Sequence, residues 1–360
     1  MYPALAVLQA KNLLESDSSS PVLWVGGAGG MEVDLVTRAG IPFQTIPAAG
    51  LHGVGLKALP GNLVRIAQGF RRSRQILREF QPDVALFTGG FVAAPVALAI
   101  RTIARRPKIY LYVPDIEPGL ALKSLGRLAD RIAVTARESI PFFTNPKRVV
   151  VTGYPTRAEL ARWDRKDAQA ALELDPALPT LLVFGGSKGA RSINLARLAS
   201  LTELLAEMQI VHISGSLDWE TVSTARLSLP ENLRSRYHAY PYLHETMGAA
   251  LSAADLVVSR AGASSLGEFP LFSLPAVLVP YPYAWRYQKV NAEHLANQGA
   301  AVLLEDHRLQ GELAGTVLAL MHDGGRRAGM ASAMAALQKP DAARAIVQDL
   351  LDLSLAQRSA

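Results

Sequence analysis

The chain has 360 residues, of which 49% are hydrophobic and 19% are charged, so it holds enough apolar material for two globular domains. It has no cysteine, which excludes disulfides, thiolate metal sites and cysteine nucleophiles and fits a cytoplasmic protein. The net charge of +6 favours an anionic partner, either a nucleic acid, an anionic lipid or a phosphorylated substrate.

The first half of the chain alternates short apolar runs with helix-length segments. A helix-like run follows Met1 without a basic leader, and further helices are expected at 61–80 and 93–105. Strands are expected at 22–25, 84–87, 109–112, 132–134 and 149–151. This alternation is typical of parallel sheets covered by helices.

A polar, helix-prone stretch at 158–178 is interpreted as a linker, and a second alternating series follows it. Strands are expected there at 181–184, 210–213, 256–258, 276–279 and 301–304. The predicted fold is α/β, with two Rossmann-like parallel-sheet domains that face each other across a cleft. The expected domains are 1–153 and 154–338, and a C-terminal helix in 339–360 is expected to pack back toward the first domain.

The most apolar region, 269–285, contains four prolines, which suit strands and loops better than a membrane helix. No segment is therefore predicted to span a bilayer.

Paired glycines follow three of the predicted strands, at Gly26-Gly27, Gly89-Gly90 and Gly185-Gly186. Glycine lets the backbone turn tightly and brings amide groups close to a ligand, which indicates a site that handles phosphate. None of these turns matches the P-loop or the dinucleotide pattern, so those two classes are disfavoured.

The stretch 255–291 combines two predicted strand ends, a small-residue turn and a helix that carries Glu268. Its last part holds Gln288 and Asn291. This arrangement predicts a site for a phosphorylated ligand that is rich in hydroxyl groups.

A competing motif is G-x-S-x-G at 185–189, where Ser187 follows a strand and precedes a helix. Asp255 and His294 follow in the order of a serine hydrolase triad. The same serine is equally suited to bind a phosphate at the start of a helix, so both interpretations stay open.

No metal site is expected, because the seven histidines are scattered and no Asp-x-Asp pair exists. The charge of a leaving diphosphate then has to be met by cations near strand ends, and the candidates are Arg157, Lys188, Arg191 and Arg260.

The segment 61–80 is a basic amphipathic helix. It is predicted to contact an anionic membrane surface, to pack its apolar side on the sheet, or to do both. Nucleic-acid binding is not predicted, because no known module is present.

Motifs spread over nearly the whole chain resemble one family, the MurG-type N-acetylglucosaminyltransferases of glycosyltransferase family 28. The residues that carry the resemblance are Tyr2–Ala6, Thr88–Phe91, Pro118–Leu120, Val151–Arg157, Gly185–Arg191, Pro241–Leu243, Arg260–Glu268, Gln288 and Asn291.

The resemblance implies a GT-B fold whose C-terminal domain holds UDP-N-acetylglucosamine and whose N-terminal domain receives an undecaprenyl-linked muramyl-pentapeptide. It implies inverting transfer, from lipid I to lipid II in peptidoglycan synthesis, without a metal or cofactor. The expected place is the cytoplasmic face of the cell membrane, as a peripheral protein. The implied donor contacts are Ser187 and the turn of Ala263, Ser264 and Ser265 at the diphosphate, Arg157 on the donor, Leu243 at uracil, Glu268 at ribose and Gln288 at the sugar.

The sequence departs from the family pattern at Phe91, where a tyrosine is common, at Tyr154, where an asparagine is usual, and in two further places that bear on catalysis. The family places a strand and a Gly-Thr-Gly-Gly-His loop, whose histidine is a favoured base, ahead of the motif in which this chain has Met1. A late start site is the expected explanation, and a protein that begins at Met1 is expected to express poorly or to lack transfer activity. Asp115 replaces a family asparagine that contacts donor or acceptor, and it is either a candidate base or a turn cap.

Three alternatives stay open beside lipid II synthesis. They are transfer to another lipid or small-molecule acceptor, UDP-sugar binding without catalysis, and hydrolysis by Ser187.

Overall fold

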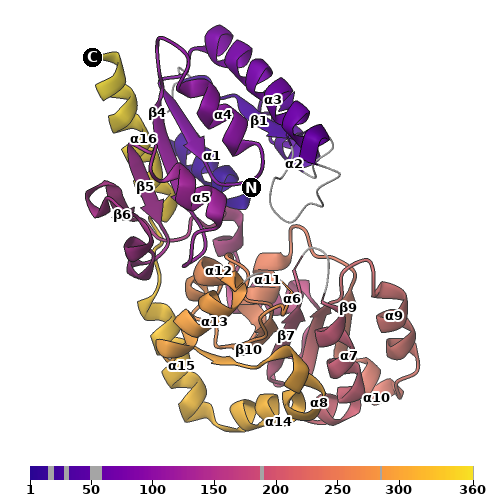
Figure 1. Ribbon diagram of the computed structural model, residues 1–360. Coiled ribbons are helices and arrows are strands. Elements are labelled where there is room, and N and C mark those ends of the chain that lie inside the picture. Colours follow the sequence, from indigo (N-terminus) through magenta and orange to yellow (C-terminus); the bar gives the residue numbers. More distant parts are fainter. Residues whose placement is uncertain (15–19, 28–31, 49–58, 187–189, 284–285, 360) are drawn as a thin grey trace. The chain divides into compact units, whose positions relative to one another are not determined.

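The structure is a computed structural model that describes residues 1–14, 20–27, 32–48, 59–186, 190–283 and 286–359 (Figure 1). The chain forms two compact units. The first unit comprises residues 1–114, 118–155 and 341–360, and the second comprises 115–117 and 156–340.

The first unit contains two parallel sheets, β1-β2 and β3-β4-β5-β6. The strands are β1 (Trp24–Gly27), β2 (Phe43–Ile46), β3 (Val84–Phe87), β4 (Lys108–Val113), β5 (Arg131–Val134) and β6 (Val149–Val151). The helices are α1 (Tyr2–Leu14), α2 (Glu32–Arg38), α3 (Leu59–Phe80), α4 (Ala93–Ile100), α5 (Leu120–Leu125) and α16 (Ala342–Arg358).

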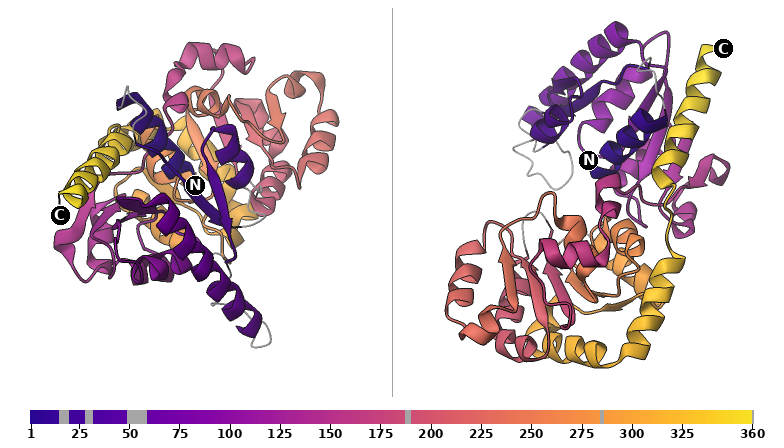
Figure 2. Two further views of the ribbon diagram at one scale, coloured as in Figure 1. Left: turned by 90° about the horizontal axis from the view of Figure 1, so that it is seen from above. Right: turned by 180° about the vertical axis from the view of Figure 1, so that it is seen from behind.

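Strand β4 shows why the larger sheet of this unit is covered on both faces. Successive side chains of a strand point to opposite faces. Ile109 and Leu111 belong to a core with residues of α4 and α5, whereas Tyr110 and Tyr112 pack with residues of α1 and α16. The last helix of the chain therefore lies along the sheet of the first unit, as Figures 1 and 2 show from different sides.

The second unit is built on one parallel sheet of six strands, in the order β12-β11-β10-β7-β8-β9. The strands are β7 (Thr180–Phe184), β8 (Gln209–Ile213), β9 (Tyr237–Tyr240), β10 (Leu256–Ser259), β11 (Ala276–Leu278) and β12 (Ala301–Leu303). The helices are α6 (Arg165–Ala171), α7 (Arg191–Ala199), α8 (Leu201–Glu207), α9 (Trp219–Leu227), α10 (Glu231–Arg234), α11 (Met247–Ala253), α12 (Ser265–Leu271), α13 (Tyr287–Asn297), α14 (Leu309–His322) and α15 (Gly324–Ala336).

The predicted strands are all present within two residues of their expected bounds. Strands β2 and β9 are not anticipated by the sequence, because both are edge strands with few buried side chains. The helix expected at 93–105 ends at Ile100, where the Thr102 hydroxyl donates to the Ala99 carbonyl at 2.9 Å. Among the described residues, no helix combines the length and apolarity needed to cross a bilayer.

Candidate functional site

The second unit has a topological switch point between β7 and β10. These strands are adjacent and parallel, but the chain leaves β7 toward β8 and leaves β10 toward β11. The loops at their carboxyl ends therefore diverge, and open α/β sheets bind ligands at such points.

The loop after β7 is the first side of this site. Gly186 has a φ of +92°, a conformation that residues with a side chain rarely adopt, so glycine is required for the turn. Ser187 and Lys188 lie outside the described residues. The chain resumes at Ala190, and α7 begins at Arg191, whose side chain is exposed.

The turn after β10 is the second side. The Ser265 hydroxyl and amide both donate to the Gly262 carbonyl, at 2.6 and 3.0 Å, and start α12. Ala263 and Ser264 form the turn itself and are partly exposed.

Glu268 stands one turn into α12. Burial raises its pKa from the usual 4.5 to about 7, although the Arg157 guanidinium and a hydrogen bond from the Ser264 side chain act in the opposite direction. Arg157 also pairs with Glu159, with 3.4 Å between nitrogen and oxygen. The structure thus places Arg157, Ser264 and Glu268 together and leaves a carboxyl that titrates near neutral pH.

Two further predicted residues lie at the same edge of the sheet. The Gln288 side-chain carbonyl accepts from the Tyr281 amide at 2.9 Å, which orients the side chain. Its NH2 group has no acceptor among the described residues, so it is available to donate to a hydroxyl. Leu243 lies in the loop that follows β9, two strands from β7.

Arg260 does not serve as the free cation that was expected. It is 8% exposed and pairs with Asp306, with 2.6 Å between nitrogen and oxygen. It also donates to the Val279 carbonyl at 3.2 Å and the Ser192 hydroxyl at 2.8 Å. Arg260 therefore connects the ends of β10 and β11 to the first turn of α7, and its guanidinium is engaged by these contacts instead of a phosphate.

Asn291 holds the segment 115–117 against the second unit. It is fully buried, and its NH2 group donates to Asp115 Oδ1 at 2.8 Å and to the Ala261 carbonyl at 3.1 Å. Its carbonyl accepts from the Ile116 amide at 3.0 Å. Burial raises the pKa of Asp115, and the hydrogen bond from Asn291 opposes that shift.

A buried polar chain fixes α7 from the other side. The Asn194 NH2 group donates to the Ser214 carbonyl at 2.9 Å and to Asp218 at 2.8 Å, so its carbonyl accepts from Nε2–H of His212 at 2.9 Å. Nδ1 of His212 then accepts from the Tyr237 hydroxyl at 2.8 Å, and Tyr237 accepts from Arg197. Burial holds the pKa of His212 well below 6.5, so this histidine is neutral.

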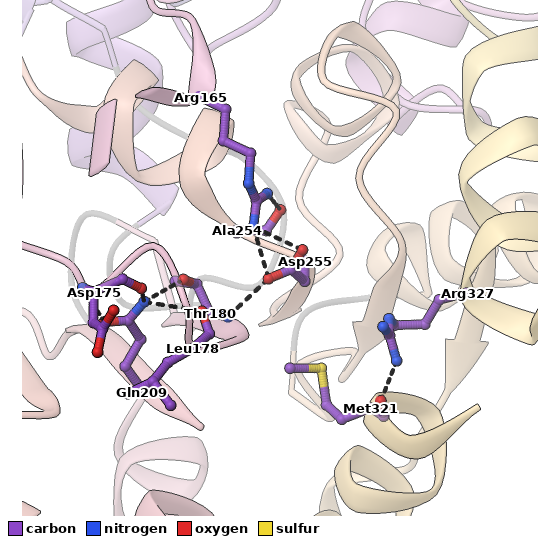
Figure 3. Close-up of polar contacts among 9 residues, drawn as sticks. All are labelled: Arg165, Asp175, Leu178, Thr180, Gln209, Ala254, Asp255, Met321 and Arg327. Carbon is purple, nitrogen blue, oxygen red and sulfur yellow. Dashed lines mark hydrogen bonds and ion pairs between the residues drawn. The ribbon is translucent and has the colours of Figure 1, made fainter. Parts of the chain in front are cut away.

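The predicted hydrolase triad joins Ser187, Asp255 and His294. Figure 3 shows Asp255 held by Arg165, at 2.8 Å, and by the amide of Thr180, the first residue of β7, also at 2.8 Å. Asp255 therefore lies at the amino end of β7, whereas Gly186 follows the carboxyl end, and a strand of this length separates its two ends by about 15 Å. Ser187 lies outside the described residues, and the position of Asp255 gives the hydrolase interpretation no support.

Comparison with known families accounts for both units. The glycosyltransferase family 28 N-terminal domain matches residues 1–134, and the glycosyltransferase family 28 C-terminal domain matches residues 180–346. The chain belongs to glycosyltransferase family 28.

Family 28 relatives match along the whole chain. A protein of Roseiflexus sp. (strain RS-1) is 38% identical over 100% of this chain and 94% of its own length. One of Desulforudis audaxviator (strain MP104C) is 37% identical over 96% of this chain and 93% of its own. Both are named UDP-N-acetylglucosamine--N-acetylmuramyl-(pentapeptide) pyrophosphoryl-undecaprenol N-acetylglucosamine transferase. The predicted resemblance to the MurG-type transferases is confirmed.

Solved structures agree with this assignment. MurG of Acinetobacter baumannii has a TM-score of 0.74 and 25% identity over 98% of this chain and 95% of its own. The calicheamicin glycosyltransferase CalG4 shares the fold, with a TM-score of 0.65 and 16% identity over 98% of this chain and 95% of its own. The predicted GT-B class, with two Rossmann-like parallel-sheet domains, is confirmed.

The sequence alone did not reveal the hydrogen bonds of Asn291 or the polar chain through His212. One signal for the second was present, because Arg197 occupies the apolar side of α7, four residues after the buried Ile193. A charged residue in that position has to be paired by buried polar groups.

Proposed function

We propose that this chain transfers N-acetylglucosamine from UDP-N-acetylglucosamine to an undecaprenyl-linked N-acetylmuramyl-pentapeptide, and so converts lipid I to lipid II. The observation that carries the proposal is the match of both units, over the whole chain, to relatives that bear that name. The switch point between β7 and β10 supplies a site of the right chemistry for such a donor.

The donor is proposed to bind the second unit alone. The Ala263–Ser265 turn and the loop of Ser187 face the diphosphate, and Arg157 adds positive charge beside Glu268. The Glu268 carboxylate accepts from ribose hydroxyls, the free NH2 group of Gln288 donates to a sugar hydroxyl, and the Leu243 backbone contacts uracil. The Arg157 guanidinium and the backbone amides of the turn supply the positive charge at the leaving diphosphate.

The reaction is proposed to invert the anomeric centre. The 4-hydroxyl of the acceptor sugar attacks C1 of N-acetylglucosamine while UDP leaves from the opposite face. This requires a base that takes the hydroxyl proton and fixed positive charge at the departing diphosphate.

The test is UDP release by the purified chain with UDP-N-acetylglucosamine and a lipid I analogue. Turnover with this acceptor and none with unrelated glycolipids or small aglycones would support the proposal, and it would overturn the expectation that a protein beginning at Met1 lacks transfer activity. Turnover that prefers another acceptor would redirect the function within the same fold. Donor binding without turnover on any acceptor would indicate a UDP-sugar-binding protein.

We further propose that α3 attaches the first unit to the anionic cytoplasmic face of the cell membrane. Leu63 and Val64 are 57% and 56% exposed, and Arg65, Arg71 and Arg78 are exposed on the same helix. In its second half α3 buries Ser73, Ile76 and Leu77. A helix with exposed apolar and basic side chains together is suited to a lipid surface.

Vesicle sedimentation tests this attachment. The double variant R65E/R71E is expected to lose binding to vesicles that contain anionic lipid, and the wild-type chain is expected to dissociate as salt is raised. R308E, which reverses an exposed arginine in the second unit, is the control and should bind as the wild type does. Equal binding by all three would exclude α3 as the contact.

A further inference from the structure

We propose that Asp115 is the general base of this chain, the group that takes the proton from the acceptor hydroxyl. The inference rests on the transfer reaction proposed above and adds to it a residue that acts on the reacting atoms.

The position of Asp115 is set by the second unit. One NH2 group of Asn291 bonds both the Asp115 carboxylate and the carbonyl of Ala261, at 2.8 and 3.1 Å. Ala261 immediately precedes the turn after β10. Asn291 also lies one helical turn after Gln288 on α13, so the two side chains share one side of that helix. Asp115 is thus held between the turn and the helix that carries Gln288.

This position of Asp115 is beside the donor bond that is proposed to break. A donor whose diphosphate lies at the Ala263–Ser265 turn and whose sugar contacts Gln288 has its anomeric carbon between the two. A base has to lie within hydrogen-bond reach of a hydroxyl that attacks this carbon. Asn291 fixes the Asp115 carboxylate beside both elements.

The neighbouring acids are neutralised by arginines. Glu117 pairs with Arg286 at 2.7 Å, and Asp306 pairs with Arg260 at 2.6 Å. Within the described parts of the chain, no arginine or lysine lies within ion-pair distance of Asp115, and its one hydrogen-bond partner is the neutral amide of Asn291. Its affinity for a proton is therefore not suppressed by a cation.

Burial has the direction that a base needs. Loss of solvent raises the pKa of Asp115 above its usual value, and only the Asn291 hydrogen bond opposes this. The charged groups on the elements around Asp115 are Glu117, Arg260, Glu268, Arg286, Lys289 and Glu293. None of them contributes to the shift in the pKa of Asp115. The family resemblance places an asparagine at this position, and asparagine has the same shape but cannot take a proton.

The step balances without a further reactant. As the bond from the acceptor oxygen to C1 forms, the hydroxyl proton moves to the Asp115 carboxylate. The bond from C1 to the phosphate oxygen breaks, and UDP leaves with the electron pair. The protonated carboxyl then releases its proton to solvent.

The test compares D115N with the wild type by steady-state kinetics on UDP-N-acetylglucosamine and a lipid I analogue. We expect kcat to fall by about 10²- to 10⁴-fold, with the KM for the donor within about threefold of the wild type. D115E should restore part of kcat. An acceptor analogue with a thiol in place of the 4-hydroxyl, which ionises without help, should be used by D115N almost as well as by the wild type.

E117Q is the matched control, because it makes the same acid-to-amide change two residues away and should keep its kcat. Full kcat in D115N would overturn the proposal while leaving the transfer function intact. Loss of donor binding in D115N would also overturn it, because Asp115 would then be a binding group. A wild-type chain that binds the donor and transfers to no acceptor would refute the function itself, and the base with it.

Discussion

The raised pKa of Glu268 predicts how strongly the affinity for the donor depends on pH. Its carboxyl has a pKa raised to about 7 by burial. A carboxylate accepts hydrogen bonds from two ribose hydroxyls, whereas in the protonated form one oxygen carries the single hydrogen and acts as a donor. Donor binding is therefore expected to select the ionised form and to expel the proton.

The expected magnitude is the fraction of protein in which Glu268 is ionised. Because a group with a pKa of about 7 is about one-tenth ionised near pH 6 and nine-tenths ionised near pH 8, the apparent Kd for UDP-N-acetylglucosamine should be about tenfold weaker at the lower pH. This corresponds to about 1.4 kcal/mol. The donor itself does not titrate in this range, since both of its phosphates are esterified.

Isothermal titration calorimetry in two buffers of different ionisation enthalpy measures both the affinity and the released proton. Near pH 7 the wild type should release about half a proton per donor bound. E268Q should bind more weakly and show no slope with pH, and E312Q, which changes an exposed carboxylate, should behave as the wild type. A pH-independent Kd in the wild type, or an unchanged slope in E268Q, would refute the reasoning.

Three further predictions concern the architecture around the site. R260M should destabilise the second unit by about 3 kcal/mol in urea unfolding, because it leaves the Val279 and Pro280 carbonyls without this donor and Asp306 with the Ser192 hydroxyl in place of its cation, whereas R308M breaks an exposed pair and should cost less than about 1 kcal/mol. His212 should keep its proton on Nε2 and stay neutral in ¹⁵N NMR spectra well below pH 6.5, and an imidazolium signal near pH 6 would contradict this. Because the pKa of His212 is depressed in the folded state, its contribution to stability is present above about pH 6.5 and is lost as pH falls. I346A should cost about 2–5 kcal/mol, because Ile346 is fully buried in the first unit, and L355A, on the exposed side of the same helix, should leave the melting temperature nearly unchanged; equal effects would mean that α16 is not part of that core.

The sequence predicts the strands of this fold well because most of them are central and buried on both faces. Runs such as those of β4 and β10 are apolar throughout, and the helices between them show a clear period. The edge strands β2 and β9 lack that signal, since an edge needs fewer apolar side chains. The start of α12 is also predictable, because its small residues and its acid are local features of the sequence.

Contacts between residues far apart in the chain are not predictable in this way. Nothing in the local sequence of Arg260 shows that Asp306 neutralises it, and its place near a strand end makes it a candidate phosphate ligand. Asp115 and Asn291 are separated by 176 positions, and only the folded chain shows that they share a hydrogen bond. The triad order of Ser187, Asp255 and His294 is a weak guide in the same way, because order along the chain does not determine which edge of a sheet a residue such as Asp255 occupies.

The place of α16 has a consequence for how the protein is made. Its Ile346 and Val347 complete the packing around Tyr110 and Tyr112 in the first unit, but a ribosome synthesises them after every residue of the second unit. The packing of the first unit therefore cannot be completed until α16 has been made. Until then, α1 is the helix that covers this face of its larger sheet. Domains commonly fold in the order of their synthesis. In this protein the second unit can finish first, and the first unit closes once α16 has been synthesised.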